Sequence, residues 1–214
     1  MLVKYCGIKN EEEFNMVLQS QAHYIGFIFF KGSKRYVSPA SVMSWLETHS
    51  FIDKQLVGVF VNEEIRTIHE IAKQASLDVI QCHGQETVEQ LQLLKDLGYE
   101  VWKALPHQQD TLEKMKKYRD VVDGYVIDSK VKDQFGGTGI TFDWTDVPAY
   151  TKQAVYDKKK CLIAGGITSH NVTELLTHHP IGLDLSSGIE TDGLKDSEKI
   201  TVIERNVFYD IQQA

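Results

Sequence analysis

The sequence predicts an α/β fold in which one domain, residues 1–214, forms a (βα)8 TIM barrel. Short runs rich in β-branched residues alternate with amphipathic helical stretches along the whole chain, which indicates a parallel sheet covered by helices. Eight such units share 214 residues, at about 27 residues each, near the compact end of the range for this barrel. Linkers and low-complexity tracts are lacking, so one domain is the simplest interpretation.

A doubly wound open sheet is the structural alternative. Such a sheet usually has fewer strands and carries a nucleotide-binding loop after its first strand. Here the segment Cys6-Gly7-Ile8-Lys9-Asn10 contains no Gly-x-Gly-x-x-Gly pattern, and this favours the barrel.

Runs enriched in β-branched and aromatic residues mark the expected strands. The first run ends at Cys6-Gly7 and the sixth ends at Asp128. In chain order the expected strands are residues 2–7, 24–30, 56–61, 78–82, 100–104, 124–128, 161–164 and 182–185.

The stretches between the strands carry apolar residues at helical spacing, as Ile65 and Ile68 illustrate. Asn10, Ser38 and Asn62 precede three of these stretches and are suitable N-caps. The expected helices are residues 11–21, 39–48, 63–75, 86–97, 109–118, 142–153, 169–177 and 197–211.

Composition bounds the partners and the location of the protein. A hydrophobic content of 42% is ordinary for a globular protein, and a net charge of -7 argues against a basic nucleic-acid surface. The N-terminus begins a strand without a signal-peptide pattern, and the longest apolar run, residues 24–30, is too short to span a bilayer. We therefore expect a cytoplasmic protein without nucleic-acid or membrane partners, as a monomer or a homodimer.

The three cysteines differ in their sequence context. Their odd number and wide spacing argue against a disulfide framework. Cys82 and Cys161 lie within strand-like runs and are expected to be small buried hydrophobic residues. Cys6 lies at a strand tip beside Gly7, where a reactive thiol is as reasonable as a buried one.

Active sites of such barrels lie at the C-terminal ends of the strands, so polar residues there are candidates for function. Cys6 ends the first strand and Asp128 ends the sixth. A base on one strand tip and an acid on another is the arrangement that a proton-moving isomerase needs.

The period of a strand sorts the residues near the other strand ends. Gln81 and His83 are two residues apart and are expected to face the pocket, while Cys82 faces the helices. By the same logic Lys4 and Cys6 share one face. A lysine inside the barrel requires a partner, and the sequence does not identify it.

Turns rich in glycine and serine follow the last two strands. Gly165-Gly166 follows the seventh strand and Ser186-Ser187-Gly188 follows the eighth. Many barrels of this kind bind a phosphate group at these two positions, through backbone N–H groups and a helix N-terminus. The pair of turns therefore predicts a phosphate site.

Two loops complete the predicted mouth of the pocket. Arg35 lies in the loop after the second strand, where its planar guanidinium suits a carboxylate or phosphate, although a solvated charge is the commoner role for such a residue. The glycine-rich segment Gly136-Gly137-Thr138-Gly139 follows Asp128 and is expected to act as a lid, with a flexible surface loop as the alternative.

These segments together resemble the phosphoribosylanthranilate isomerase family of tryptophan biosynthesis. The matching segments run in order along the chain: Val3-Lys4-Tyr5-Cys6-Gly7, Tyr24-Ile25-Gly26-Phe27-Ile28-Phe29-Phe30, Ser33-Lys34-Arg35-Tyr36-Val37, Val57-Gly58-Val59-Phe60-Val61, Gln81-Cys82-His83-Gly84, Gly136-Gly137-Thr138-Gly139, Phe142-Asp143-Trp144, Ala164-Gly165-Gly166 and Asp184-Leu185-Ser186-Ser187-Gly188. Each is short, but the ordered set is specific.

The resemblance implies a cofactor-free Amadori rearrangement of N-(5-phosphoribosyl)anthranilate, a small phosphorylated substrate. It implies that Cys6 is the general base, that Asp128 is the general acid and that Arg35 holds the anthranilate carboxylate. The turns at Gly165-Gly166 and Ser186–Gly188 would bind the phosphate.

Three further residues have open roles. Asp184 could orient the amine or the hydroxyl groups of the substrate, or it could pair with Lys4. Gln81 and His83 could contact the substrate or support Cys6.

Rival functions remain at this point. A metal-dependent isomerase or epimerase on the same barrel would need His83, Asp128 and Asp184 as ligands. A non-catalytic barrel that senses a phosphorylated ligand is a second rival. Retention of both the acid and the base argues against the sensor. A fused partner activity would have to lie on a separate polypeptide, since one barrel accounts for all 214 residues.

Overall fold

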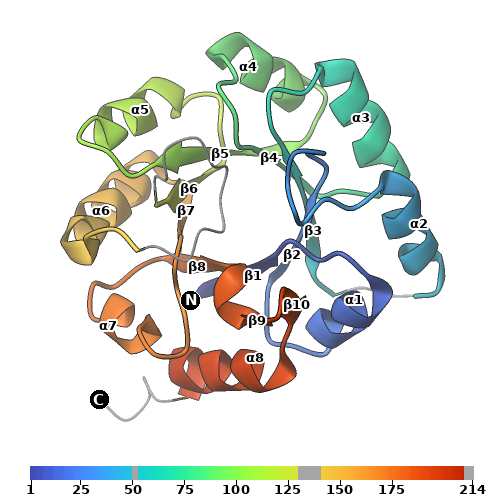
Figure 1. Cartoon of the computed structure of the whole chain (residues 1–214). Coiled ribbons are helices and arrows are strands. Elements are labelled where there is room, and N and C mark those ends of the chain that lie inside the picture. The colour runs from blue at the N-terminus through green and yellow to red at the C-terminus, as the bar shows by residue number, and fades with distance from the viewer. Residues whose placement is uncertain (50–52, 130–140, 210–214) are drawn as a thin grey trace.

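Eight parallel strands close into a barrel in which each strand pairs with its neighbours in sequence and β8 pairs back onto β1 (Figure 1). The computed structural model describes residues 1–49, 53–129 and 141–209. The closed barrel confirms the predicted fold class and excludes the open sheet, because each of the strands β1 to β8 has two neighbours. In the described part of the chain, no helix has the length and hydropathy needed to cross a membrane.

The strands agree with the prediction to within two residues at each end. They are enriched in residues that fit a pleated, buried surface, as parallel strands covered on both faces require. Their bounds are β1 Leu2–Cys6, β2 Tyr24–Ile28, β3 Gln55–Phe60, β4 Val79–Cys82, β5 Glu100–Pro106, β6 Gly124–Asp128, β7 Lys160–Ala164 and β8 Gly182–Leu185.

Helices form a ring around the barrel (Figure 1). Most are shorter than predicted, because capping residues and turns occupy the ends of the amphipathic stretches. Their bounds are α1 Glu11–Leu18, α2 Pro39–Glu47, α3 Ile65–Gln74, α4 Val88–Asp96, α5 Thr111–Tyr118, α6 Val147–Asp157, α7 Val172–Leu176 and α8 Ser197–Glu204.

The largest error at the start of a helix concerns α6, predicted at residues 142–153. Asp143 instead caps a short 3-10 helix, Trp144–Asp146, and α6 starts at Val147 with a proline in its first turn. The helix then continues to Asp157, where Lys158 ends it in a left-handed conformation.

Two of the three predicted caps are confirmed. The side chains of Asn10 and Ser38 accept hydrogen bonds from the first turns of α1 and α2. Asn62 is not a cap. Its φ of 51° turns the chain away from the helix, and its Oδ1 accepts a hydrogen bond from Gln85 N at 2.6 Å instead.

Two small elements were not predicted. Ser187–Ile189 forms a 3-10 helix after β8, and a hairpin of two short strands follows it, β9 Glu190–Thr191 and β10 Leu194–Lys195. In Figure 1 this hairpin lies between α8 and the barrel. It therefore brings residues from the end of the chain to the site.

Side chains of alternate residues divide the core into two parts. One cluster lies between the strands and the helices and includes Phe14, Phe27 and Trp45. A smaller cluster fills the barrel interior, and Trp102 and Val126 belong to it. Because packed side chains fill this interior, polar groups gather above it, at the C-terminal ends of the strands.

Candidate active site

A pocket lies at the C-terminal ends of the strands. Every predicted site residue within the described ranges lines it: Cys6, Arg35, Gln81, His83, Asp128, Gly165, Gly166, Asp184, Ser186, Ser187 and Gly188. The predicted lid segment, Gly136-Gly137-Thr138-Gly139, lies outside the described residues.

Cys6 has room in the pocket wall because its neighbour on β2 lacks a side chain. Gly26 is its register partner, and a Cβ on Gly26 would lie 2.8 Å from Cys6 Sγ and 3.0 Å from Lys4 Cε. Only a glycine on β2 therefore lets both side chains occupy this part of the barrel.

The environment of the thiol contains two opposing influences. Cys6 is buried, and burial raises its pKa, while the positive charge of Lys4 lowers it in part. The net pKa is above the ordinary value, so the thiol form prevails in the free protein. A base of this kind has to be deprotonated within the complex.

Lys4 has the partner that the sequence left open. Its Nζ lies 2.9 Å from Asp184 Oδ2, and the two residues are register partners on β1 and β8. Burial alone would lower the pKa of Lys4, but the Asp184 carboxylate outweighs it and holds the pKa above its ordinary value. Lys4 therefore stays charged beside Cys6.

Two buried acceptors in the pocket have no hydrogen-bond partner among the described residues. They are the second carboxylate oxygen of Asp184, Oδ1, and the amide oxygen of Gln81, Oε1. Unpaired buried acceptors are costly and uncommon. Both suit a ligand that brings N–H or O–H donors.

Asp128 ends β6 on another side of the same pocket and is 6% exposed. Its backbone is fixed, because His107 N donates to Asp128 O at 2.7 Å. His83 Nε2 lies 3.5 Å from Asp128 Oδ2. Gln81 and His83 line the pocket and Cys82 packs in the outer core, as the strand period predicted.

The two predicted phosphate turns lie against each other. Gly165 and Gly166 have φ values of 87° and 66°, which favour glycine. The carbonyl oxygen of Ile167 occupies the place where Gly188 would carry a Cβ, so the second turn packs on the first. Ser187 begins a 3-10 helix, whose first N–H groups have no acceptor within the helix.

Arg35 is buried, so its interpretation as a solvated loop charge is wrong. Its Nε and Nη2 donate to the two carboxylate oxygens of Glu190, each at 2.7 Å. Its stem passes over Gly7, where a Cβ would lie 2.5 Å from Arg35 Cδ. The loop therefore folds inward onto the first strand tip and carries the guanidinium into the pocket.

Sequence reasoning missed Glu190 and its partner Lys195. Both lie on the β9–β10 hairpin, whose strands of two residues are too short to show an alternating pattern. Glu190 could have been found from the sequence, because an arginine that is buried requires an acidic partner. Glu190 follows Gly188 by two residues, directly after the predicted phosphate turn.

Within the described ranges, no group of three or more His, Cys, Asp or Glu side chains could hold a metal ion. His83, Asp128 and Asp184 thus do not form the ligand set that the metal-dependent rival needs. The arrangement suits acid–base chemistry, with a thiol and a carboxyl at separate strand tips and an arginine and two glycine-rich turns for anionic groups.

A family model and a curated relative identify the same family. The model of the N-(5'phosphoribosyl)anthranilate (PRA) isomerase family matches residues 3–206. The N-(5'-phosphoribosyl)anthranilate isomerase of Priestia megaterium is 52% identical over 207 residues, which cover 97% of this chain and 99% of that protein.

Two solved structures show the same barrel. Monomers made from the dimeric phosphoribosylanthranilate isomerase of Thermotoga maritima superpose with a TM-score of 0.81 at 31% identity, covering 96% of this chain and 98% of that one. A phosphoribosyl anthranilate isomerase in complex with reduced 1-(o-carboxyphenylamino)-1-deoxyribulose 5-phosphate gives a TM-score of 0.80 at 30% identity, with the same coverage.

Proposed function

This chain belongs to the N-(5'-phosphoribosyl)anthranilate isomerase family, and we propose that Cys6 is the general base and Asp128 the general acid of its reaction. The enzyme catalyses the Amadori rearrangement of N-(5-phosphoribosyl)anthranilate to 1-(2-carboxyphenylamino)-1-deoxyribulose 5-phosphate in tryptophan biosynthesis. The observation that carries the proposal is that the two groups end β1 and β6 and line one pocket.

Asp128 starts the reaction by giving a proton to the ring oxygen of the ribose. The ring opens as its C–O bond breaks, and the nitrogen lone pair forms an iminium with C1′. Asp128 is placed for this step because it ends β6 and its side chain lines the pocket. His83, 3.5 Å from its Oδ2, helps to fix the orientation of the carboxyl group.

Cys6 then removes the proton from C2′, which the neighbouring iminium has made acidic. The electrons of the C–H bond form the enolamine, and this becomes the ketone when its O2′ hydroxyl loses a proton and C1′ gains one. The Lys4 charge favours the thiolate that this step requires, since it lowers the pKa of Cys6 against the effect of burial. Lys4 is thereby a positioning residue rather than a proton donor.

The anionic ends of the substrate fit two separate parts of the pocket. The turns at Gly165-Gly166 and Ser186-Ser187-Gly188 hold the phosphate through backbone N–H groups. Arg35 holds the anthranilate carboxylate through its free guanidinium edge. Substrate bound at both ends lies across the tips of β1 and β6. The segment 136–139 is proposed as a lid over it.

Asp184 and Gln81 orient the middle of the substrate. The unpaired oxygens Asp184 Oδ1 and Gln81 Oε1 are acceptors for its amine N–H and ribose hydroxyl groups. Asp184 therefore has both of the roles that the sequence left open. Its Oδ2 pairs with Lys4, and its Oδ1 faces the ligand.

The reaction as proposed needs only the phosphorylated substrate and these side chains. We expect the protein to work in the cytoplasm, as a monomer or a homodimer, without a metal or organic cofactor. Turnover in excess chelator tests the metal-dependent rival. An unchanged rate supports the acid–base proposal, and a rate restored only by added divalent metal would overturn it.

A substrate labelled with deuterium at C2′ tests the proton-abstraction step directly. In single-turnover experiments the wild-type protein should convert it more slowly than unlabelled substrate and release the label to solvent. The Cys6→Ser variant should release almost no label. Label release at the wild-type rate in Cys6→Ser would exclude Cys6 as the base.

A further inference from the structure

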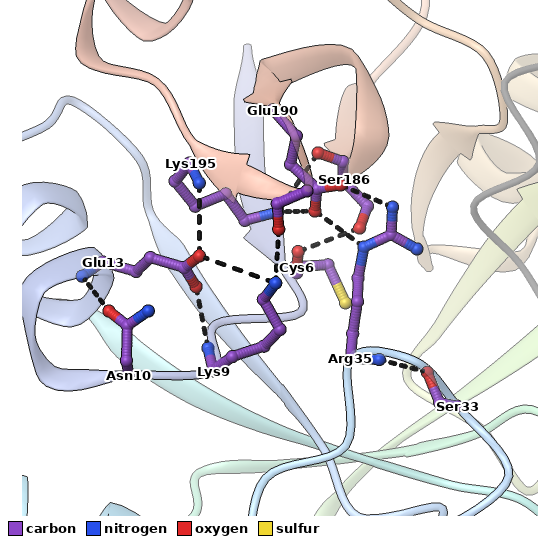
Figure 2. Close-up of polar contacts among 10 residues, drawn as sticks. Cys6, Lys9, Asn10, Glu13, Ser33, Arg35, Ser186, Glu190 and Lys195 are labelled. Atoms are coloured by element: carbon purple, nitrogen blue, oxygen red, sulfur yellow. Dashed lines mark hydrogen bonds and ion pairs between the residues drawn. The ribbon is translucent and has the colours of Figure 1, made fainter.

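Five charged residues form a connected group beside the first strand tip, and we call them the Arg35 cluster (Figure 2). They are Lys9, Glu13, Arg35, Glu190 and Lys195. They come from the start of the chain, from the loop after β2 and from the β9–β10 hairpin. Arg35 lines the pocket, whereas Glu190 has no role in the reaction described above.

Glu190 occupies only one edge of the Arg35 guanidinium. Its two oxygens accept from Nε and Nη2 at 2.7 Å each, so the plane of the group is fixed by a bidentate contact. The third nitrogen, Nη1, makes no hydrogen bond to the described residues and points away from Glu190 in Figure 2. The Nη1–Nη2 edge is therefore available for a second carboxylate.

Lys195 holds Glu190 in the position that this contact requires. Its buried Nζ donates to Glu190 Oε1 at 2.8 Å and to Ser186 O at 3.1 Å. Its backbone N donates to Glu13 Oε1 at 3.2 Å, which attaches the hairpin to α1. One lysine thus connects the carboxylate that orients Arg35 with the turn proposed for the phosphate.

The two carboxylates of the cluster, Glu13 and Glu190, lie among cations. Burial lowers the pKa of Lys195, and the Glu190 carboxylate opposes that effect. Burial alone would raise the pKa of Glu190, but hydrogen bonds and charge from Arg35 and Lys195 hold it below its ordinary value. Glu190 is therefore anionic at neutral pH and holds the Arg35 guanidinium by charge as well as by two hydrogen bonds.

We propose that Glu190, held by Lys195, is a positioning residue that orients Arg35 so that its free edge selects substrates carrying an aryl carboxylate. The inference rests on the proposed role of Arg35 as the carboxylate clamp. Glu190 itself does not touch the ligand. Its effect is on discrimination between ligands with and without the carboxylate, and not on the proton transfers.

Two ligands separate this role from a general loss of structure. One is the reduced product analogue, 1-(o-carboxyphenylamino)-1-deoxyribulose 5-phosphate in reduced form, and the other is the same molecule with a phenyl ring that lacks the carboxylate. Their dissociation constants are measured by calorimetry for the wild type, Arg35→Ala, Glu190→Gln and the double variant. The dissociation constant of the phenyl analogue divided by that of the carboxylated analogue reports the contribution of the carboxylate, and this quotient is the ratio used below.

Glu190→Gln is expected to weaken the carboxylated analogue about tenfold and to leave the phenyl analogue unchanged. The amide keeps the volume of the carboxylate, but its N–H₂ group faces the N–H donors of Arg35, so the guanidinium turns out of position. In the Arg35→Ala background the same substitution should change the ratio no further, because Glu190 acts through Arg35. KM should rise in Glu190→Gln with kcat nearly unchanged.

Two further variants keep the test decisive. Asp123→Asn is the matched control, because it removes a carboxylate paired with Lys95 at the opposite end of the barrel and should leave the ratio unchanged. Glu190→Asp keeps the charge but is too short to reach both donors, so it should also lower the ratio. Glu190→Asp is the test variant if the Glu190→Gln protein does not fold.

The outcomes that contradict the inference are distinct. A ratio unaffected by Arg35→Ala would overturn the clamp itself and with it this role of Glu190. A ratio lowered by Arg35→Ala but retained in both Glu190 variants would overturn the positioning role alone. Tighter binding of the carboxylated analogue to Glu190→Gln would show that Glu190 competes with the ligand for Arg35, which also overturns the inference.

Discussion

The ammonium group of Lys4 lies 2.9 Å from Asp184 Oδ2 inside the barrel, where the two residues are register partners on adjacent strands. Both side chains are buried. The same lysine lowers the pKa of Cys6 against the effect of burial. One buried ion pair therefore connects the proposed base with Asp184, whose second oxygen is proposed to contact the substrate.

Lys4→Met should weaken both the fold and the base. Removing one partner of a buried ion pair leaves an uncompensated carboxylate, so we expect the free energy of unfolding to fall by about 3–5 kcal/mol in urea titrations. Without the positive charge, the pKa of Cys6 rises further. The rise of kcat/KM with pH should then move to higher pH than in the wild type. A pH profile that stays in place would show that Lys4 does not act on the thiol.

Gly26→Ala should misplace the thiol without unfolding the barrel. The new Cβ would lie 2.8 Å from Cys6 Sγ, so Cys6 and Lys4 must both shift. A displacement of this size costs roughly 100-fold in rate for a positioned catalytic group. Gly182→Ala is the matched control, since its Cβ would lie 2.9 Å from Leu2 Cβ, at the opposite end of the barrel. Equal losses of kcat in the two variants would contradict the account.

Glu86 is expected to make the stability of the fold depend on pH. It is buried with Lys103 at 3.0 Å. Burial alone would raise its pKa, but the charge of Lys103 and hydrogen bonds, including one from Asn62 N, hold the pKa below its ordinary value. A lowered folded pKa gives stability that is complete above the unfolded value and is lost as the pH falls through the folded one.

Glu86→Gln should therefore be less stable than the wild type at neutral pH, and the difference should shrink as the pH falls through the lowered pKa of Glu86. Urea titrations over a series of decreasing pH values measure the difference. A difference between the two proteins that does not change with pH would show that the carboxylate charge contributes nothing.

The strands and most of the pocket could be predicted because both depend on local sequence. Strand period alone placed Gln81 and His83 in the pocket and Cys82 in the outer core, and the structure agrees. Cys6 and Asp128 could be predicted as candidate site residues because each ends a strand, and the barrel brings all such ends to one face.

The parts that could not be predicted depend on contacts between distant residues. Arg35 and Glu190 are 155 positions apart, and the hairpin that carries Glu190 is too short to have a recognisable period. Asn62 suits an N-cap by type, but its left-handed backbone and its contact with Gln85 direct it elsewhere. Tertiary contacts decide such positions, and local pattern does not encode them.

Turnover of freshly made N-(5-phosphoribosyl)anthranilate by the wild type, Cys6→Ser and Asp128→Asn tests the central assignment most directly. Loss of anthranilate fluorescence follows the reaction, and binding of the reduced product analogue shows that each variant is folded. We expect activity in the wild type and a loss of about 100-fold or more in both variants, with binding retained. Turnover near the wild-type rate in either folded variant would contradict the assignment of base and acid.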